Sequence, residues 1–122
     1  MAEVWVDAGE PEDIDAEDVI RFDHGGKTYA LYRTEDDRYF ATDGLCTHEK
    51  IHLAGGLVMG TIIECPKHNG RFDVRTGEAV RLPAQKPLCT YPITEREGRL
   101  VATMRDDRES AALLEVSAER TL

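Results

Sequence analysis

Hydrophobic and polar positions alternate in short runs along most of the chain, and turn residues separate one run from the next. Residues 19–23 and 27–33 are two such runs, rich in β-branched and aromatic residues, with Gly25-Gly26 between them. Alternation with a period of two is typical of half-buried strands, and a glycine pair between two strands indicates a hairpin. His24 lies at the tip of this hairpin, so we expect its side chain to be exposed and to bind no metal.

Further short strands are predicted along the rest of the chain, up to residue 104. They cover residues 3–6, 39–42, 57–65 with a turn at Gly60, 71–74, 88–94 and 100–104. No helix longer than about two turns is predicted before residue 105. Many short strands separated by frequent turns predict an all-β fold built of antiparallel sheets.

The last stretch, residues 105–122, has a different pattern. Asp106 with Glu109 three residues later can cap a helix, and one helical face would then carry Ala111, Leu114, Ala118 and Leu122. We expect either a short helix that packs on the domain or on a neighbouring molecule, or a frayed tail. The chain therefore divides into a domain at residues 1–104 and a C-terminal tail at residues 105–122.

The composition narrows the choice of partners. The 122 residues include 24 acidic and 15 basic side chains, which give a net charge of −9. This charge argues against nucleic acid as a partner, because binding to phosphates needs a basic face. The acidity is compatible with solubility alone, or with steering toward a basic docking surface on another protein. The seven acidic residues between Asp7 and Asp18 are more typical of a solvated surface than of a docking face.

The first residues of the chain and the length of its apolar runs bear on the cellular location of the protein. The start, Met-Ala-Glu, lacks the basic residues and the apolar segment of a secretory signal, and no apolar run is long enough to span a membrane. We expect a soluble, cytoplasmic protein and a monomer. Thiols stay reduced in the cytoplasm, which argues against the alternative that Cys46 and Cys65 form a disulfide.

Two Cys/His pairs are the strongest chemical signal in the sequence. They are Cys46-Thr47-His48 and Cys65-Pro66-Lys67-His68, separated by sixteen residues. Two thiolates and two imidazoles are ligands for a soft metal site, either one zinc ion or a [2Fe–2S] cluster. A zinc finger usually takes both cysteines from one loop and both histidines from a helix. Here each loop supplies one ligand of each kind, which favours a binuclear centre whose two irons take different ligands.

The two pairs and the residues around them resemble the Rieske-type [2Fe–2S] ferredoxins. The resemblance covers about residues 1–104, includes a proline loop in the segment LPAQKPLCTYPI, and rests on framing residues Leu53, Gly56, Pro66, Phe72, Asp73, Thr76 and Gly77. Among subgroups, the segments WVDAG, ATDGLCTHE and ECPKHNGRFD are most similar to the MocE-type ferredoxins of rhizopine catabolism. The ferredoxins of aromatic ring-hydroxylating dioxygenases are similar to nearly the same degree.

The resemblance implies a Rieske fold, in which a cluster-binding subdomain at about residues 43–86 is inserted into antiparallel β-sheets. It implies one [2Fe–2S] cluster per chain, with Cys46 and Cys65 on the inner iron and His48 and His68 on the outer iron, near the surface. The implied function is that of a soluble one-electron carrier that passes electrons from an NAD(P)H-dependent reductase to a terminal oxygenase in a catabolic pathway. Such a protein is not itself an enzyme, and its partners dock near the two histidines.

Several neighbouring residues complete the expected site. His52 is expected to be an exposed residue at the rim and not an extra ligand, and Cys89 a small buried hydrophobic residue. Ile51, Leu53 and Pro83 are expected to form an apolar collar around the histidine rings. No hydroxyl follows His68 closely, so we expect a potential near the low end of the Rieske range, roughly −150 mV. The alternatives are a zinc-stabilised binding module and a small Rieske-fold subunit of a larger reductase, as in the nitrite reductase small subunit.

Overall fold

The structure, a computed structural model, describes residues 3–48 and 50–105 and is built almost entirely of strands. The strands are β1 Glu3–Gly9, β2 Asp18–His24, β3 Lys27–Arg33, β4 Tyr39–Asp43, β5 Leu57–Met59, β6 Ile62–Glu64, β7 Arg71–Asp73, β8 Ala79–Arg81, β9 Thr90–Tyr91, β10 Ile93–Arg96 and β11 Arg99–Arg105. Two short 3-10 helices, η1 Pro11–Asp13 and η2 Leu53–Gly55, lie between them. The predicted all-β fold class is therefore confirmed.

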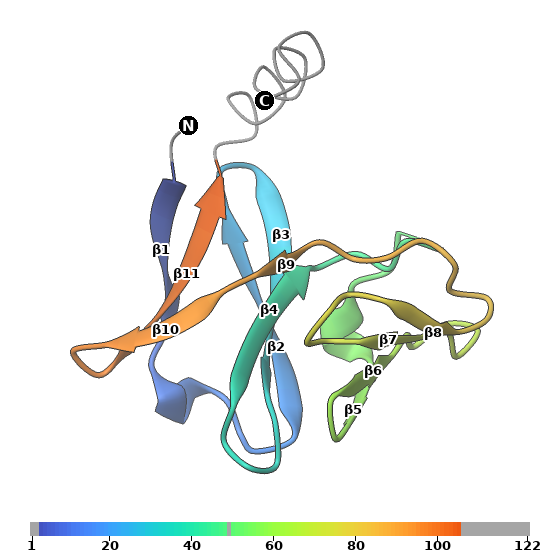
Figure 1. The fold of residues 1–122 in the computed structure, drawn as a ribbon, viewed down its shortest axis with the longest axis horizontal. Coiled ribbons are helices and arrows are strands. Elements are labelled where there is room, and N and C mark those ends of the chain that lie inside the picture. Colours follow the sequence, from blue (N-terminus) through green and yellow to red (C-terminus); the bar gives the residue numbers. More distant parts are fainter. Residues whose placement is uncertain (1–2, 49, 106–122) are drawn as a thin grey trace, which may run out of the picture.

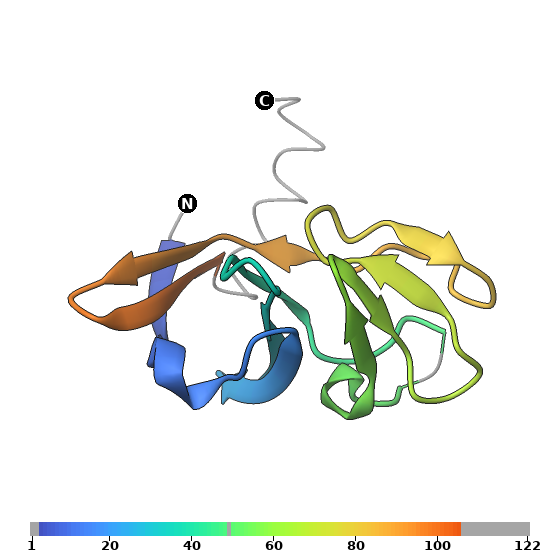
Figure 2. The same ribbon diagram turned by 90° about the horizontal axis from the view of Figure 1, so that it is seen from below.

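The strands form three antiparallel sheets, with strand orders β1-β11-β10, β2-β3-β4-β9 and β5-β6-β7-β8. Figure 1 shows the third sheet, in green and yellow, beside the body formed by the other two sheets. The view in Figure 2 shows the same division, with the chain crossing to the third sheet after β4 and returning at β9. The third sheet occupies residues 57–81 and so falls within the predicted insertion.

The β2–β3 hairpin follows its prediction closely. Its register pairs Phe22 with Tyr29 and His24 with Lys27, so that Gly25 and Gly26 form the turn. Both glycines have positive φ, 60° and 80°, a conformation that glycine adopts without the steric cost met by other residues. His24 is exposed, as expected.

The strand predicted at residues 88–94 is wrong as a single element. Thr90–Tyr91 joins β4 in one sheet, whereas Ile93–Arg96 joins β11 in another. Pro92 lies between the two pieces and has no N–H to continue a ladder, although its carbonyl accepts from the Thr103 N–H at 3.0 Å. Strand β8 and the β1–β11 pairing, which joins the two ends of the described domain, were not anticipated either.

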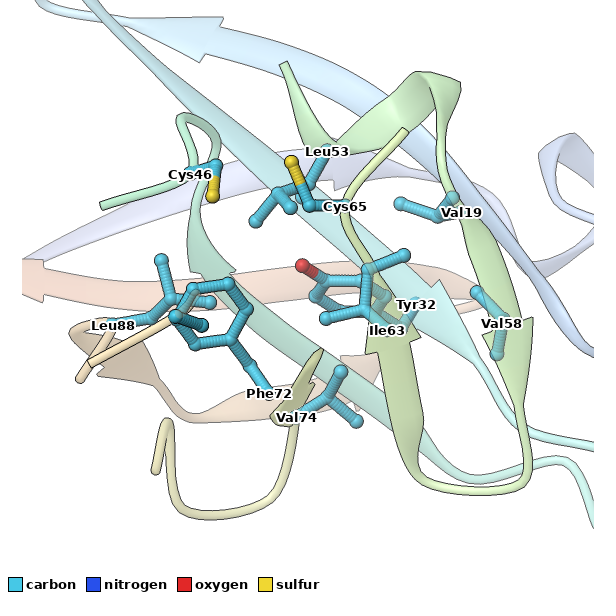
Figure 3. Close-up of a cluster of buried hydrophobic side chains, with 12 residues drawn as sticks. Val19, Tyr32, Cys46, Leu53, Val58, Ile63, Cys65, Phe72, Val74 and Leu88 are labelled. Carbon is cyan, nitrogen blue, oxygen red and sulfur yellow. The ribbon is translucent and has the colours of Figure 1, made fainter. Parts of the chain in front are cut away.

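Strand β3 is buried on both faces and separates the hydrophobic cores. Tyr29 and Leu31 face the space between the first two sheets, where they pack with residues such as Ala102 and Leu100. Ala30 and Tyr32 face the opposite way, toward the third sheet. That core, shown in Figure 3, contains both site cysteines and also Val19, Leu53, Val58, Ile63, Phe72, Val74, Ala84 and Leu88. Each large apolar side chain buried there stabilises the fold by about 1.5–3 kcal/mol, so this core fixes the third sheet on β3.

The helix considered at the C-terminus falls on residues 106–122, which lie outside the described part of the chain. The division into a domain at residues 1–104 and a tail remains a prediction. Within the described residues, no helix has the length and apolar character needed to cross a membrane.

Candidate metal centre

The first Cys/His pair lies on a closed loop that follows β4. The Cys46 N–H donates to the Ile51 carbonyl at 2.9 Å, and outside this bond the Leu53 N–H donates to the Gly44 carbonyl at 2.8 Å. These two bonds fix the base of the loop. The Cys46 side chain is thereby held in the core, while His48 projects into solvent from the exposed part of the loop.

The second pair lies on a similar loop between β6 and β7. The Cys65 N–H donates to the Gly70 carbonyl at 2.7 Å, so this loop is also closed by a bond from the cysteine to a residue five positions later. His68 and Asn69 have positive φ values, 69° and 61°. This left-handed conformation costs of order 1 kcal/mol for residues other than glycine, and such strain is concentrated at functional sites.

The structure brings the four predicted ligands together as two unlike pairs. Cys46 and Cys65 are 2% and 1% exposed, and Figure 3 shows them near each other at the edge of the core. His48 and His68 are exposed, with ring centroids 5.5 Å apart and ring planes at 70°. Both site cysteines are free thiols, so the alternative of a disulfide between them is wrong. Two buried thiols therefore lie beneath two exposed imidazoles.

This donor set fits a binuclear iron–sulfur cluster. Each iron of a Rieske centre takes two protein ligands, two thiolates on one iron and two imidazoles on the other. The buried cysteines would hold the iron that faces the core, and the exposed histidines would hold the iron that faces solvent. In the described part of the chain, no three His, Cys, Asp or Glu side chains gather around one point that a single ion would occupy. A [2Fe–2S] cluster does not require such a group.

The loop at residues 82–87 contacts both ligand loops. Thr47 donates its hydroxyl hydrogen to the Lys86 carbonyl at 2.7 Å. On the other side, a Cβ added at Gly70 would lie 3.0 Å from the backbone nitrogen of Ala84, so a glycine is needed for this close approach. A hollow of about 230 Å³ beside His48 is lined by Thr47, His48, Pro83, Gln85 and Lys86.

The predicted apolar collar is only partly correct. Ile51 and Pro83 are half-buried next to the ligand loops. Leu53 is 0% exposed, because it begins η2 and packs in the core beneath the loop, so its predicted place in the collar is wrong. Leu82, next to Pro83, is instead 69% exposed. The loop at residues 82–87 therefore exposes apolar surface next to Pro83, which lines the hollow beside His48.

His52 is not an exposed residue at the rim, and that prediction is wrong. Its side chain is half-buried, and Nδ1 accepts from the Ala54 N–H at 2.9 Å, which caps η2. Nδ1 therefore carries no proton, and Nε2 donates to the Thr28 hydroxyl at 2.8 Å. Desolvation, and then the positive charge of Arg21, hold the pKa of His52 below its usual 6.5. His52 thus fastens the first ligand loop to β3.

Cys89 is exposed, and the prediction of a buried residue is wrong. Its neighbour Leu88 is buried in the core, and adjacent residues of an extended chain point in opposite directions. Partial desolvation, followed by the Asp43 carboxylate, raises the pKa of the Cys89 thiol. The thiol is therefore protonated near neutral pH and is not placed as a metal ligand.

A contact between β4 and β9 also supports the site. The Tyr91 hydroxyl donates to Asp43 Oδ1 at 2.6 Å, and burial together with this bond raises the pKa of Tyr91. Asp43 ends β4 immediately before the first ligand loop, so the bond fixes where that loop begins. The two partners are 48 residues apart in the sequence, so no local sequence pattern indicates this contact.

Comparisons with known proteins agree on one family. Residues 4–92 match the family model described as Rieske [2Fe-2S] domain. The chain is 42% identical over 104 residues to the ferredoxin component of the naphthalene 1,2-dioxygenase/salicylate 5-hydroxylase systems of Ralstonia sp, covering 85% of this chain and 99% of that protein.

Two solved structures are similar along most of their length. One is the complex of reduced oxygenase and oxidized ferredoxin in carbazole 1,9a-dioxygenase, with a TM-score of 0.76, 31% identity and coverage of 80% of this chain and 91% of that one. The other is the ferredoxin of carbazole 1,9a-dioxygenase from Nocardioides aromaticivorans IC177, with a TM-score of 0.78, 28% identity and coverage of 83% and 98%.

Proposed function

Because the chain belongs to the Rieske [2Fe–2S] domain family, we propose that it passes single electrons from an NAD(P)H-dependent reductase to a terminal oxygenase. The family and its ferredoxin relatives identify the fold as a Rieske fold and the cofactor as a [2Fe–2S] cluster. When bound, the cluster supplies reversible one-electron chemistry. The relatives are ferredoxin components, so the chain is an electron-transfer component and not the catalyst.

We assign Cys46 and Cys65 to the inner iron and His48 and His68 to the outer iron. The observation that carries this assignment is the contrast between two buried thiols and two exposed imidazoles on loops closed in the same way. The core beneath the cysteines excludes water from the thiolate side. The histidine rings reach the surface, where a partner can approach them directly.

The partner surface is proposed to surround His48 and His68. The exposed Leu82, the half-buried Ile51 and the hollow beside His48 give this surface an apolar centre. One structural relative is a complex of an oxygenase with its ferredoxin, which supports an oxygenase as one partner here. A contact of this kind is expected to be small and transient.

The named relatives favour the carrier over the zinc-stabilised binding module and over a subunit of a larger reductase. The monomeric state, the cytoplasmic location, the catabolic pathway and the MocE-type subgroup remain predictions from the sequence.

Ligand substitutions test the assignment. Cys65→Ser and His68→Ala should each reduce the iron and acid-labile sulfide of the purified protein to a small fraction of the wild-type content. Cys89→Ser and His24→Ala are matched controls, because these side chains are exposed and lie on other segments, and both should keep the wild-type content. A full cluster in the first two variants, or its loss in the controls, would contradict the assignment.

A further inference from the structure

Charge is distributed unevenly between the predicted cluster-binding segment and the rest of the chain. Residues 43–86 contain six basic and five acidic side chains, a net charge of +1, whereas the remaining residues carry −10. The acidity of the protein as a whole therefore does not describe the end at which the imidazoles are exposed.

Two of the five acidic side chains in this segment are paired with arginines, and a third is held by a hydrogen bond. Arg71 donates to Glu64 at 2.9 Å, and Arg75 donates to Asp73 at 2.8 Å. Asp43 accepts from the Tyr91 hydroxyl and lies partly buried at the end of β4. These carboxylates contribute little negative field at the exposed surface.

Lysines lie on all three loops that surround the imidazoles. Lys50 is two residues after His48, Lys67 directly precedes His68, and Lys86 shares the hollow beside His48. All three side chains are exposed. Among the described residues, Lys50 and Lys86 form no ion pair, so their charges are available to a partner. We call Lys50, Lys67 and Lys86 the lysine rim.

We propose that the redox partner meets the cluster end with an acidic face that complements the lysine rim. The inference rests on the proposed function and specifies the chemistry of the partner. At physiological ionic strength, charges act over about 8 Å, so the rim determines the field at the contact and the distant acidic groups do not. At longer range, the acidic side chains on the first two sheets lie away from the cluster end, and they orient that end toward an acidic partner. The partner is thus acidic, whereas a basic docking surface was one of the two explanations that the net charge left open.

Small redox probes of opposite charge measure the local field without knowledge of the partner. The holoprotein is reduced with dithionite, and the excess reductant is removed. Stopped-flow absorbance then follows the transfer of one electron to an anionic probe, hexacyanoferrate(III), or to a cationic probe, hexaammineruthenium(III). The products are hexacyanoferrate(II) and hexaammineruthenium(II). Between about 100 mM and about 1 M salt, where charges act over about 10 Å or less, the rate with the anionic probe should fall by about threefold. The rate with the cationic probe should rise.

The double variant Lys50→Glu/Lys86→Glu should reverse both trends. The matched control Arg38→Glu/Arg96→Glu makes the same change in net charge on β10 and beside the β3–β4 turn, and it should leave the trends as in the wild type. The proposal is overturned if the wild type shows the opposite trends, or if the control changes them as much as the loop variant does.

A binding measurement gives a readout that does not depend on electron transfer. Fluorescein-labelled hexaglutamate should bind the wild-type protein at about 100 mM salt, measured by fluorescence anisotropy, because charges then act over only about 10 Å. It should bind the control equally, but not the loop variant. Absence of wild-type binding, or equal binding to the loop variant, would contradict an acidic partner. If the protein reduces neither redox probe, the proposed carrier function fails, whereas anisotropy still tests the charge of the surface.

Discussion

Replacement of His52 tests whether this side chain holds the first ligand loop in place. His52→Phe keeps an aromatic ring but removes the acceptor for the Ala54 N–H and the donor to Thr28. Each hydrogen bond contributes about 0.5–1.5 kcal/mol net, so the loss of both should destabilise the fold by about 2 kcal/mol. For a domain of this size, that corresponds to a decrease of about 8 °C in the unfolding midpoint.

The assay is thermal unfolding by far-ultraviolet circular dichroism at one scan rate, on samples with matched iron content. Visible absorbance recorded in parallel should disappear at a lower temperature in His52→Phe than in the wild type. His52→Asn should recover part of the loss, because asparagine can accept from the Ala54 N–H as an N-cap. His24→Phe is the control at an exposed histidine. A midpoint for His52→Phe equal to that of the wild type or of the control would refute the proposed anchoring.

The pKa of His52 is lowered in the fold, so the stabilising contribution of this side chain is complete above pH 6.5 and shrinks as the pH falls below that value through the folded pKa. The difference in unfolding midpoint between the wild type and His52→Phe should therefore be smaller at about pH 5 than at about pH 7.5. A larger difference at low pH would refute this sign. Leu53→Asp should abolish folding and cluster retention, because it places a charge at a fully buried position at a cost of more than about 3 kcal/mol. Ile51→Asp should keep the cluster and slow transfer to the oxygenase, and the two variants are compared by iron content and transfer rate; retention of the cluster by Leu53→Asp would contradict this prediction. Tyr91→Phe should lower the unfolding free energy by about 1–2 kcal/mol, since it leaves the Asp43 carboxylate without its donor; an unchanged urea midpoint would contradict this. The reduction potential of the cluster should lie near −150 mV, because hydrogen bonds from nearby side chains to the cluster sulfurs raise this potential. The Thr47 hydroxyl and the Asn69 amide are instead bonded to Lys86 and Glu64. A redox titration with a midpoint well above zero would contradict this prediction.

Local sequence patterns predicted the features that depend on neighbouring residues. The alternation and the glycine pair at residues 19–33 predicted the β2–β3 hairpin, because side-chain period and turn chemistry are both local properties. The spacing of the two Cys/His pairs likewise selected four side chains that the structure brings together. The alternation in β3 did not reveal that both of its faces are buried, since this depends on two other sheets.

Contacts between distant segments could not be predicted in this way. His52 was expected at the surface, since its bond to Thr28 joins residues 24 apart and leaves no trace in the local sequence. The bond between Thr47 and Lys86 spans 39 residues and was missed for the same reason. Leu53 was expected beside the histidines, but η2 turns its side chain into the core. The net charge was equally uninformative about the cluster end, because a sum over the chain carries no information on where the charges lie.

The most direct test of the central claim is a low-temperature EPR spectrum of the purified protein after reduction with dithionite. We expect a rhombic signal with an average g value below that of the free electron, because one iron of the reduced cluster carries histidine ligands. A colourless protein that contains stoichiometric zinc and shows no EPR signal would contradict the assignment of a Rieske cluster to Cys46, His48, Cys65 and His68.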